Sequence, residues 1–352
     1  MAKEIRSIAA VYFDRFNHRE LELNSPVPSN LELIVVIPSH NEPDLLGSLQ
    51  SLKDAFVPMD VSVEVITVVN HGVNTGSDIV NQNQQTLTQA NQFALDNNSE
   101  AITFQVIEVF DMPPKKAGVG LARKIGMDEA LGRFSKINKD GIIVCFDADS
   151  LCESNYFETI LCHFKKHPKT PGCSIHFEHP LEGNSHTIEE YNAIILYELH
   201  LRYYKNAQQY TGLPFVFHTI GSSMAVRASA YAKQGGMNKR KAGEDFYFLN
   251  KIIQLGNFTE LNTTTVIPSP RISDRVPFGT GKAVGEIVEA KQGGLETYNF
   301  KTFTELEEFV GEVFKNHKNV KASILHGLIN EFIGIEELGV KVKEIGKNSN
   351  SE

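Results

Sequence analysis

The sequence of 352 residues lacks tryptophan, has only four cysteines and contains no apolar run long enough to span a membrane. No transmembrane helix is therefore expected, because a span needs about 20 apolar residues, and only weak peripheral membrane contact stays open. The cysteines form no Cys-x-x-Cys pair, and their spacing fits no zinc framework. Reduced thiols in a cytoplasmic protein are expected. The four are Cys145, Cys152, Cys162 and Cys173.

Positive charge is also scarce, with 34 lysines and arginines against 43 aspartates and glutamates, which gives a formal net charge of −9. A nucleic-acid partner is not expected, since phosphate backbones call for a broad basic surface. Charged residues scattered through residues 1–30 interrupt any signal-peptide apolar segment. Apolar residues make up 41% of the chain, which is enough for a sizeable core in a globular protein.

Short apolar runs alternate with helical patterns through residues 31–150. The runs lie at 33–37, 63–69, 102–110 and 141–146, and their β-branched content predicts buried strands. Strands that alternate with helices in this way form a mainly parallel sheet with helices on both faces. The predicted fold class is therefore α/β.

The pattern also suggests how the chain is divided. Residues 262–285 contain three prolines and are predicted to be loop-like. The C-terminal helical pattern could provide a surface for a homodimer. The predicted segments are a leader at 1–30 with a helix near Ile5–Phe16, a main domain at 31–268 with halves 31–150 and 151–268, a lid-like loop at 269–300, helices at 301–345 and a tail at 346–352.

Three of the predicted strands end in polar residues: Ser39–Glu42, Asn70–Gly72 and Asp147–Asp149. In a parallel sheet such ends share one edge, which is where ligands bind. Asp147 and Asp149 are one residue apart, so both can reach one hard cation that also binds phosphates. The simpler alternative is a turn in which aspartate caps the next helix.

Two further segments carry candidate site residues. The basic segment Lys115–Lys124 contains Gly118 and Gly120, which allow close approach of an anion to a helix N-terminus. It is not a Walker A loop, and a solvated basic face is the alternative. Glu244 and Asp245 form a carboxylate pair that suits a general base, because one charge raises the pKa of the other. The alternative is favourable placement of acids in a first helical turn.

In their order along residues 31–260, these motifs resemble those of the family 2 glycosyltransferases, which have the GT-A fold. The resemblance implies transfer of a sugar from a nucleotide-diphosphate sugar to an unidentified acceptor hydroxyl, inversion of the anomeric carbon, and a divalent cation, Mg²⁺ or Mn²⁺. The matching segments are Val35–Glu42, Lys116–Arg123, Phe146–Ser150, Gly221–Arg227 and Gly243–Asp245.

The resemblance also assigns roles to single residues. It implies that Asp245 is the general base with Glu244 beside it, and that Asp149 binds the metal together with Asp147. The residues implied to bind the nucleotide sugar are Pro38, His40, Asn41, Glu42, Asn70, Lys116, Gly118, Arg123, Asp147, Arg271 and Arg275.

The sequence departs from the family pattern in two places. Asn70 stands where an acidic residue commonly reads the base, which leaves the donor nucleobase open. The Gln-x-x-Arg-Trp motif is missing, which argues against processive polysaccharide synthesis. Arg271 and Arg275 could replace that motif by closing over a diphosphate, although an ordinary surface loop is the alternative.

Two other functions stay open on the sequence alone. A nucleotidyltransferase on a similar scaffold would also use paired aspartates and a basic loop, but it would need a glycine-rich basic signature near the first strand. A catalytically silent nucleotide-sugar-binding protein would not need both the Asp147/Asp149 and the Glu244/Asp245 pair.

Overall fold

The structure is a computed structural model that describes residues 4–16, 19–273, 275, 279–290 and 295–316. The predicted tail at 346–352 and most of the predicted C-terminal helices lie outside these residues. The chain divides into two compact units. Unit 1 contains Met1–Ile194 and His218–Glu289, and unit 2 contains Ile195–Phe217 and Ala290–Glu352.

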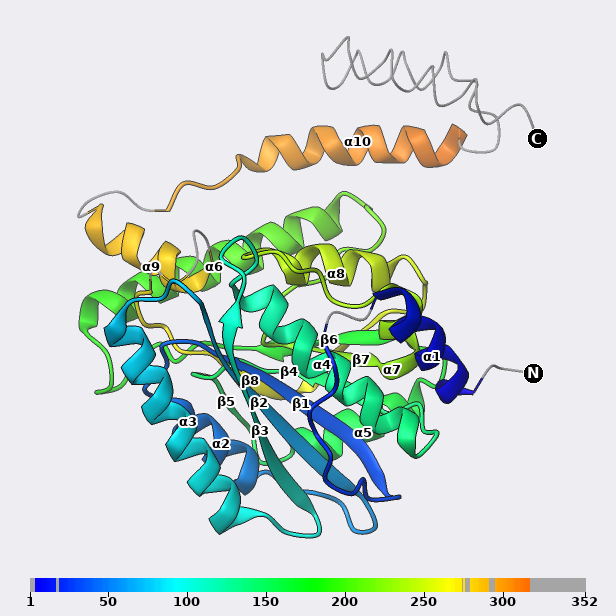
Figure 1. Cartoon of the computed structure of the whole chain (residues 1–352). Coiled ribbons are helices and arrows are strands. Elements are labelled where there is room, and N and C mark those ends of the chain that lie inside the picture. The colour runs from blue at the N-terminus through cyan, green and yellow to red at the C-terminus, as the bar shows by residue number, and fades with distance from the viewer. Residues whose placement is uncertain (1–3, 17–18, 274, 276–278, 291–294, 317–352) are drawn as a thin grey trace. The chain divides into compact units, whose positions relative to one another are not determined.

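Unit 1 is built on a sheet that has eight strands among the described residues, in the order β3-β2-β1-β4-β7-β6-β8-β5. The strands β1, β2, β3 and β4 are mutually parallel, and β6 is parallel to β8. Only β7 and β5 run the other way within the described sheet. The predicted mainly parallel α/β sheet is thus confirmed (Figure 1).

The four parallel strands arise from the apolar runs of the first half. Every residue of β2 is buried, as is all but one of β1, which is typical of strands covered on both faces. The strand β3 alternates between buried and accessible residues because it lies at the edge. Their bounds are β1 Leu31–Ser39, β2 Ser62–Gly72, β3 Ile102–Met112 and β4 Ile142–Cys145.

Helices cover both faces of this half. The chain steps outward from β1 to β2 and β3 through α2 (Leu45–Asp54) and α3 (Ser77–Asn97), which contact each other. It then returns to β4 through α4 (Val119–Lys136), and a right-handed crossover in that direction lies on the opposite face. A side chain at Gly126 of α4 would collide with Val36 and Val68, so glycine lets α4 lie close on β1 and β2 (Figure 1).

The N-terminal helix α1 (Ile5–Phe16) occupies the residues predicted for it. It packs against α4 and α7 (Ala228–Lys233). The Tyr12 hydroxyl donates to Asp128 Oδ1 at 2.6 Å and accepts a hydrogen bond from Lys124, and all three side chains are buried. The helix is therefore fixed to the sheet domain by a buried polar network.

The second half of unit 1 corrects one prediction. Residues 262–285, predicted to be loop-like, contain most of β8 (Thr259–Ile267) and more than half of α9 (Thr280–Glu289). The run of threonines and valine before Pro268 is β-branched and pairs with β6, which outweighs the nearby prolines. The remaining elements are β5 Leu151–Cys152, α5 Tyr156–Lys166, β6 Gly172–Phe177, β7 Met224–Arg227 and α8 Glu244–Ile253.

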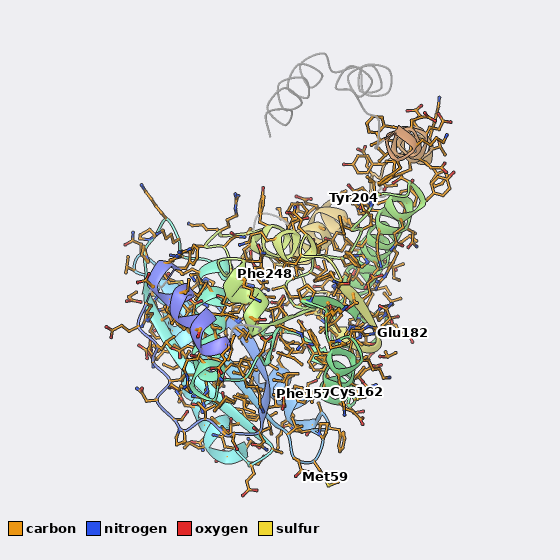
Figure 2. All side chains as sticks on the ribbon, turned by 90° about the vertical axis from the view of Figure 1, so that its right-hand side faces the viewer. Met59, Phe157, Cys162, Glu182, Tyr204 and Phe248 are labelled. Carbon is orange, nitrogen blue, oxygen red and sulfur yellow. The ribbon has the colours of Figure 1, made fainter. Side chains whose placement is uncertain are left out.

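Unit 2 contains α10 (Phe300–Asn316) and the larger part of α6 (Ile188–Tyr210). The Tyr203 hydroxyl donates to the Tyr298 carbonyl at 2.7 Å. The rings of Tyr204 and Tyr298 stack at 5.5 Å, and Phe303 lies against both. Tyr204 is labelled in Figure 2. The helix α10 confirms the predicted C-terminal helical extension.

Two general features bear on the site. None of the described helices is long and apolar enough to cross a membrane. The four cysteines are free, and burial raises the pKa of Cys145 and of Cys173 to about 12, so these thiols are inert core groups. Met59 is exposed and lies in the loop that leads into β2 (Figure 2). This loop is at the opposite end of the sheet from the carboxyl ends of the parallel strands.

Candidate functional site

The centre of the candidate site is Arg123, the fifth residue of α4. Its guanidinium forms ion pairs with Asp147, which follows β4, and with Glu244, the first residue of α8. Arg123 and Glu244 are only 5% and 2% exposed, whereas the Asp147 side chain is 39% exposed. Burial alone would lower the pKa of Arg123, but the charges of Asp147 and Glu244 raise it overall, so it stays a cation.

Glycines make this arrangement sterically feasible. A side chain at Gly221, just before β7, would collide with the Arg123 guanidinium. At the start of α4, a Cβ at Gly120 would lie 2.6 Å from the Asn238 carbonyl oxygen, and one at Gly118 would lie 2.9 Å from Lys241 Cα. The glycines predicted to admit a ligand instead admit the segment that precedes Glu244.

Asp245 differs from Glu244 in its partners. Glu244 is buried and bound to Arg123, whereas Asp245 is partly exposed and accepts a hydrogen bond from the Phe246 backbone N–H at 2.7 Å. Burial raises the pKa of Asp245, Arg123 opposes the rise, and Asp147 adds to it. Burial raises the pKa of Glu244 in the same way. Of the two predicted catalytic carboxylates, Asp245 is the one that a second molecule can reach.

A second cluster joins the ends of β1 and β4 to the loop after β8. Arg271 forms ion pairs with Glu42, with Asp149 at 2.9 Å and with Asp44 at 3.2 Å. Arg275 binds Glu42 at 2.8 Å and Asp149 at 3.2 Å. Both arginines predicted to lie in a lid therefore reach the strand ends, where they neutralise two largely buried carboxylates.

Asp149 is the most crowded carboxylate of this cluster. Burial raises its pKa, the charge of Asp147 adds to the rise, and Arg271 opposes it. Glu42 is fully buried, and its second oxygen accepts a hydrogen bond from the Asp44 backbone N–H at 3.0 Å. Both oxygens of Glu42 are thus bound within the protein, whereas the resemblance implied that Glu42 binds the nucleotide sugar.

The remaining polar strand ends form one hydrogen-bonded network. The Asn70 amide donates to the carbonyls of Ser39 at 2.9 Å and Val68 at 3.1 Å. His40 Nδ1 donates to the Asn70 carbonyl at 2.8 Å. Burial lowers the pKa of His40, so its ring is neutral at pH 7 with Nε2 as an acceptor.

Asn41 completes this network. Its backbone is left-handed, with φ of 50°, a conformation that asparagine tolerates better than most residues. Its N–H donates to Asn83 Oδ1 of α3 at 2.8 Å. Pro38 is buried in β1 opposite Val68. The structure therefore places Pro38, His40, Asn41 and Asn70 together at the carboxyl ends of β1 and β2. The sequence predicted that the polar ends of these two strands lie side by side.

Whether the site suits a divalent cation depends on Asp147 and Asp149. The described residues contain no group of three or more His, Cys, Asp or Glu side chains that could hold a metal ion. Each aspartate has one oxygen bound by an arginine. A cation that takes most of its ligands from phosphates and water needs only one or two carboxylates, so the pair fits an ion that arrives with a diphosphate.

Some contacts of the site are invisible in the sequence motifs. Asp44 binds Arg271, and Asn83 holds the Asn41 turn and the Asn70 carbonyl, at 3.0 Å in the latter case. Gly221 belongs to the segment Gly221–Arg227 that resembles the family, but nothing in the sequence indicates its contact with Arg123. Asp44 lies two residues beyond a motif and could have been suspected, but no signal pointed to Asn83 inside the polar helix α3.

Residues 142–289 match the family model described as glycosyl transferase family group 2. This segment begins at β4, covers less than half of the chain and includes Asp147, Asp149, Glu244, Asp245 and Arg271. No curated protein matches this chain.

Solved structures with a similar arrangement include TarS from S. aureus. The structure of TarS residues 1–349 with UDP-GlcNAc is 15% identical, covers 86% of this chain and 80% of its own, and has a TM-score of 0.46. The structure of the same residues with UDP is 14% identical, covers 85% and 78%, and has a TM-score of 0.44.

Proposed function

We propose that this chain moves a sugar from a nucleotide-diphosphate sugar to an acceptor hydroxyl, with inversion of the anomeric carbon. The match of residues 142–289 to the model described as glycosyl transferase family group 2 supports this proposal. The observation that carries the proposal is that Arg123 forms two ion pairs, one with Asp147 after β4 and one with Glu244 at the start of α8. A donor-side carboxylate and a candidate base are thereby held by one buried cation.

Asp245 is the proposed general base. It takes the proton of the acceptor hydroxyl, whose oxygen then forms a bond to the anomeric carbon while the bond from that carbon to the donor phosphate oxygen breaks. A raised pKa makes Asp245 a stronger base than an exposed aspartate, and the charge of Arg123 opposes that rise. Glu244 positions Arg123 and is not itself the base.

Charge develops on the departing nucleoside diphosphate, and cations aimed at it lower the barrier. Arg271 and Arg275 are proposed to supply such charge when the diphosphate draws them from Glu42 and Asp149. Asp149 and Asp147 would hold a Mg²⁺ or Mn²⁺ ion, which when bound neutralises further phosphate charge. The network of His40, Asn41 and Asn70 would border the nucleoside.

A thermal-shift screen tests this proposal. UDP, GDP, CDP and dTDP are added singly, each with and without Mn²⁺, to the full chain. One of them should stabilise the protein when Mn²⁺ is present, by about 2.7 kcal/mol at a hundredfold excess over its Kd. The variant Asp149→Asn should lose the Mn²⁺ dependence of that shift. The proposal fails if no nucleotide raises the melting temperature, because a glycosyltransferase must bind its donor nucleotide. A catalytically silent nucleotide-sugar-binding protein would also give a shift, so the activity of Asp245 is tested separately.

A further inference from the structure

Two basic segments that are far apart in the sequence meet beside the candidate base. Lys115 and Lys116 immediately precede α4, and Lys239, Arg240 and Lys241 precede α8. The glycines at the start of α4 bring them together, since Gly118 lies against Lys241 and Gly120 lies against the Arg240 carbonyl. We call these five side chains the basic patch.

The patch is an uncompensated concentration of positive charge. Within the part of the chain that the structure describes, none of its five cations forms an ion pair, whereas Arg123, Lys124, Arg271 and Arg275 all do. Burial lowers the pKa of Lys239, and Lys124 and Lys116 lower it further, which reflects mutual repulsion. In a chain with a net charge of −9, such a surface favours a negatively charged ligand.

The patch is close to Asp245 along the chain, and none of its residues takes part in the cluster proposed for the diphosphate. Four Cα–Cα steps separate Lys241 from Asp245, so these two Cα atoms are at most about 15 Å apart. Two acids of α4 and α8 are already paired, Glu244 with Arg123 and Asp128 with Lys124. The cluster at Glu42 and Asp149 has its own two arginines. The patch is therefore available to the other substrate.

Aromatic rings lie next to the patch. The Arg240 guanidinium stacks over the Tyr247 ring at 3.9 Å, and Phe246 and Tyr247 are both about half exposed. Exposed rings beside a base give a sugar or polyol an apolar surface to lie on, while the cations bind charge further along the same molecule.

We propose that the acceptor carries phosphate groups, which the basic patch binds while the acceptor hydroxyl reaches Asp245. This proposal rests on the proposed function in assigning Asp245 as the base. Under this proposal Lys116 binds the acceptor, whereas the family resemblance implied that it binds the nucleotide sugar. The chemistry that the patch recognises is the phosphate group of a soluble acceptor, and a phospholipid surface is an outcome that the test below distinguishes.

The test uses binding of a short inorganic polyphosphate to the full chain, measured by calorimetry at low salt. The triple variant K239E/R240E/K241E should weaken binding by at least about tenfold and flatten its dependence on salt, since fewer counterions are released. The matched control K165E/K166E/K169E changes three exposed lysines on and after α5 and should leave affinity within about threefold of the wild type. The milder variant K239Q/K241Q serves if the triple variant does not fold.

Nucleotide binding separates this proposal from the proposed function. The triple variant should keep the thermal shift given by the nucleoside diphosphate, and loss of that shift in a folded variant would assign the patch to the donor and overturn the proposal. Unchanged polyphosphate affinity would also overturn it. So would loss of binding to anionic phospholipid vesicles with polyphosphate affinity retained, because the patch would then be a membrane contact. A wild-type chain that binds polyphosphate but no nucleotide would refute the proposed function alone.

Discussion

Arg123 holds the candidate site together through charge, and the effect can be measured in the pH dependence of activity. Its positive charge lowers the pKa of both Glu244 and Asp245 against the effect of burial. The proposed base works only when it is deprotonated, so we expect activity to rise with pH as Asp245 loses its proton. Arg123 should therefore extend activity towards lower pH.

The variant Arg123→Met removes this charge. The pKa of Asp245 should rise, so the acid limb of the kcat/KM profile of donor turnover should move to higher pH. Arg123→Lys keeps a cation and should move the limb less. A profile of Arg123→Met that is reduced in height but unmoved in pH would mean that Arg123 only supports the fold.

At the scale of elements, the loop after β8 is held to the sheet by Arg271 and Arg275. Arg271 alone binds acids from the ends of both β1 and β4. Arg271→Ala should therefore speed hydrogen exchange in residues 269–275 by about fivefold, because a partly buried ion pair contributes roughly 1 kcal/mol. Lys282→Ala, which removes an exposed contact to Glu286 in α9, is the control. Equal exchange in both variants would show that the ion pairs do not hold the loop.

The helix α1 is a second element whose attachment depends on few atoms. The Tyr12 hydroxyl bonds with Asp128 and Lys124 in a buried position. Tyr12→Phe leaves these charged partners with one bond fewer, which should lower the free energy of unfolding by about 1–3 kcal/mol. The free energy of unfolding of both variants is measured by chemical denaturation. Tyr204→Phe, at a partly exposed tyrosine, is the control. Equal stability of the two variants would contradict a structural role for this network.

Across the whole molecule, the sequence predicted the features that depend on local residue patterns. Apolar runs such as Val63–Val69 predicted strands and hence the mainly parallel sheet, and the same logic brought Asn41, Asn70 and Asp149 to one edge. The strand at Thr259–Ile267 was missed because pairing with β6, and not local composition, makes it a strand.

The partners of the charged residues could not be predicted in the same way. Arg123 and Gly118 were predicted to meet the nucleotide sugar, and the structure places Arg123 between Asp147 and Glu244 and Gly118 against Lys241. Two of these contacts, Arg123 with Glu244 and Gly118 with Lys241, join residues that are more than 100 positions apart, and no periodicity in the sequence predicts them. The meeting of Lys116 with Lys239–Lys241 arises in the same way.

The account as a whole depends on the division of work between the nucleotide site and Asp245. The most direct measurement compares the wild type with Asp245→Asn, using the sugar donor of whichever nucleotide stabilises the chain. Release of nucleoside diphosphate from that donor should fall by about 10²–10⁴-fold, while the Kd of the nucleoside diphosphate stays unchanged. Unreduced turnover in the variant would contradict the account, and so would loss of nucleotide binding in a folded protein, since either result would remove Asp245 from the role of general base.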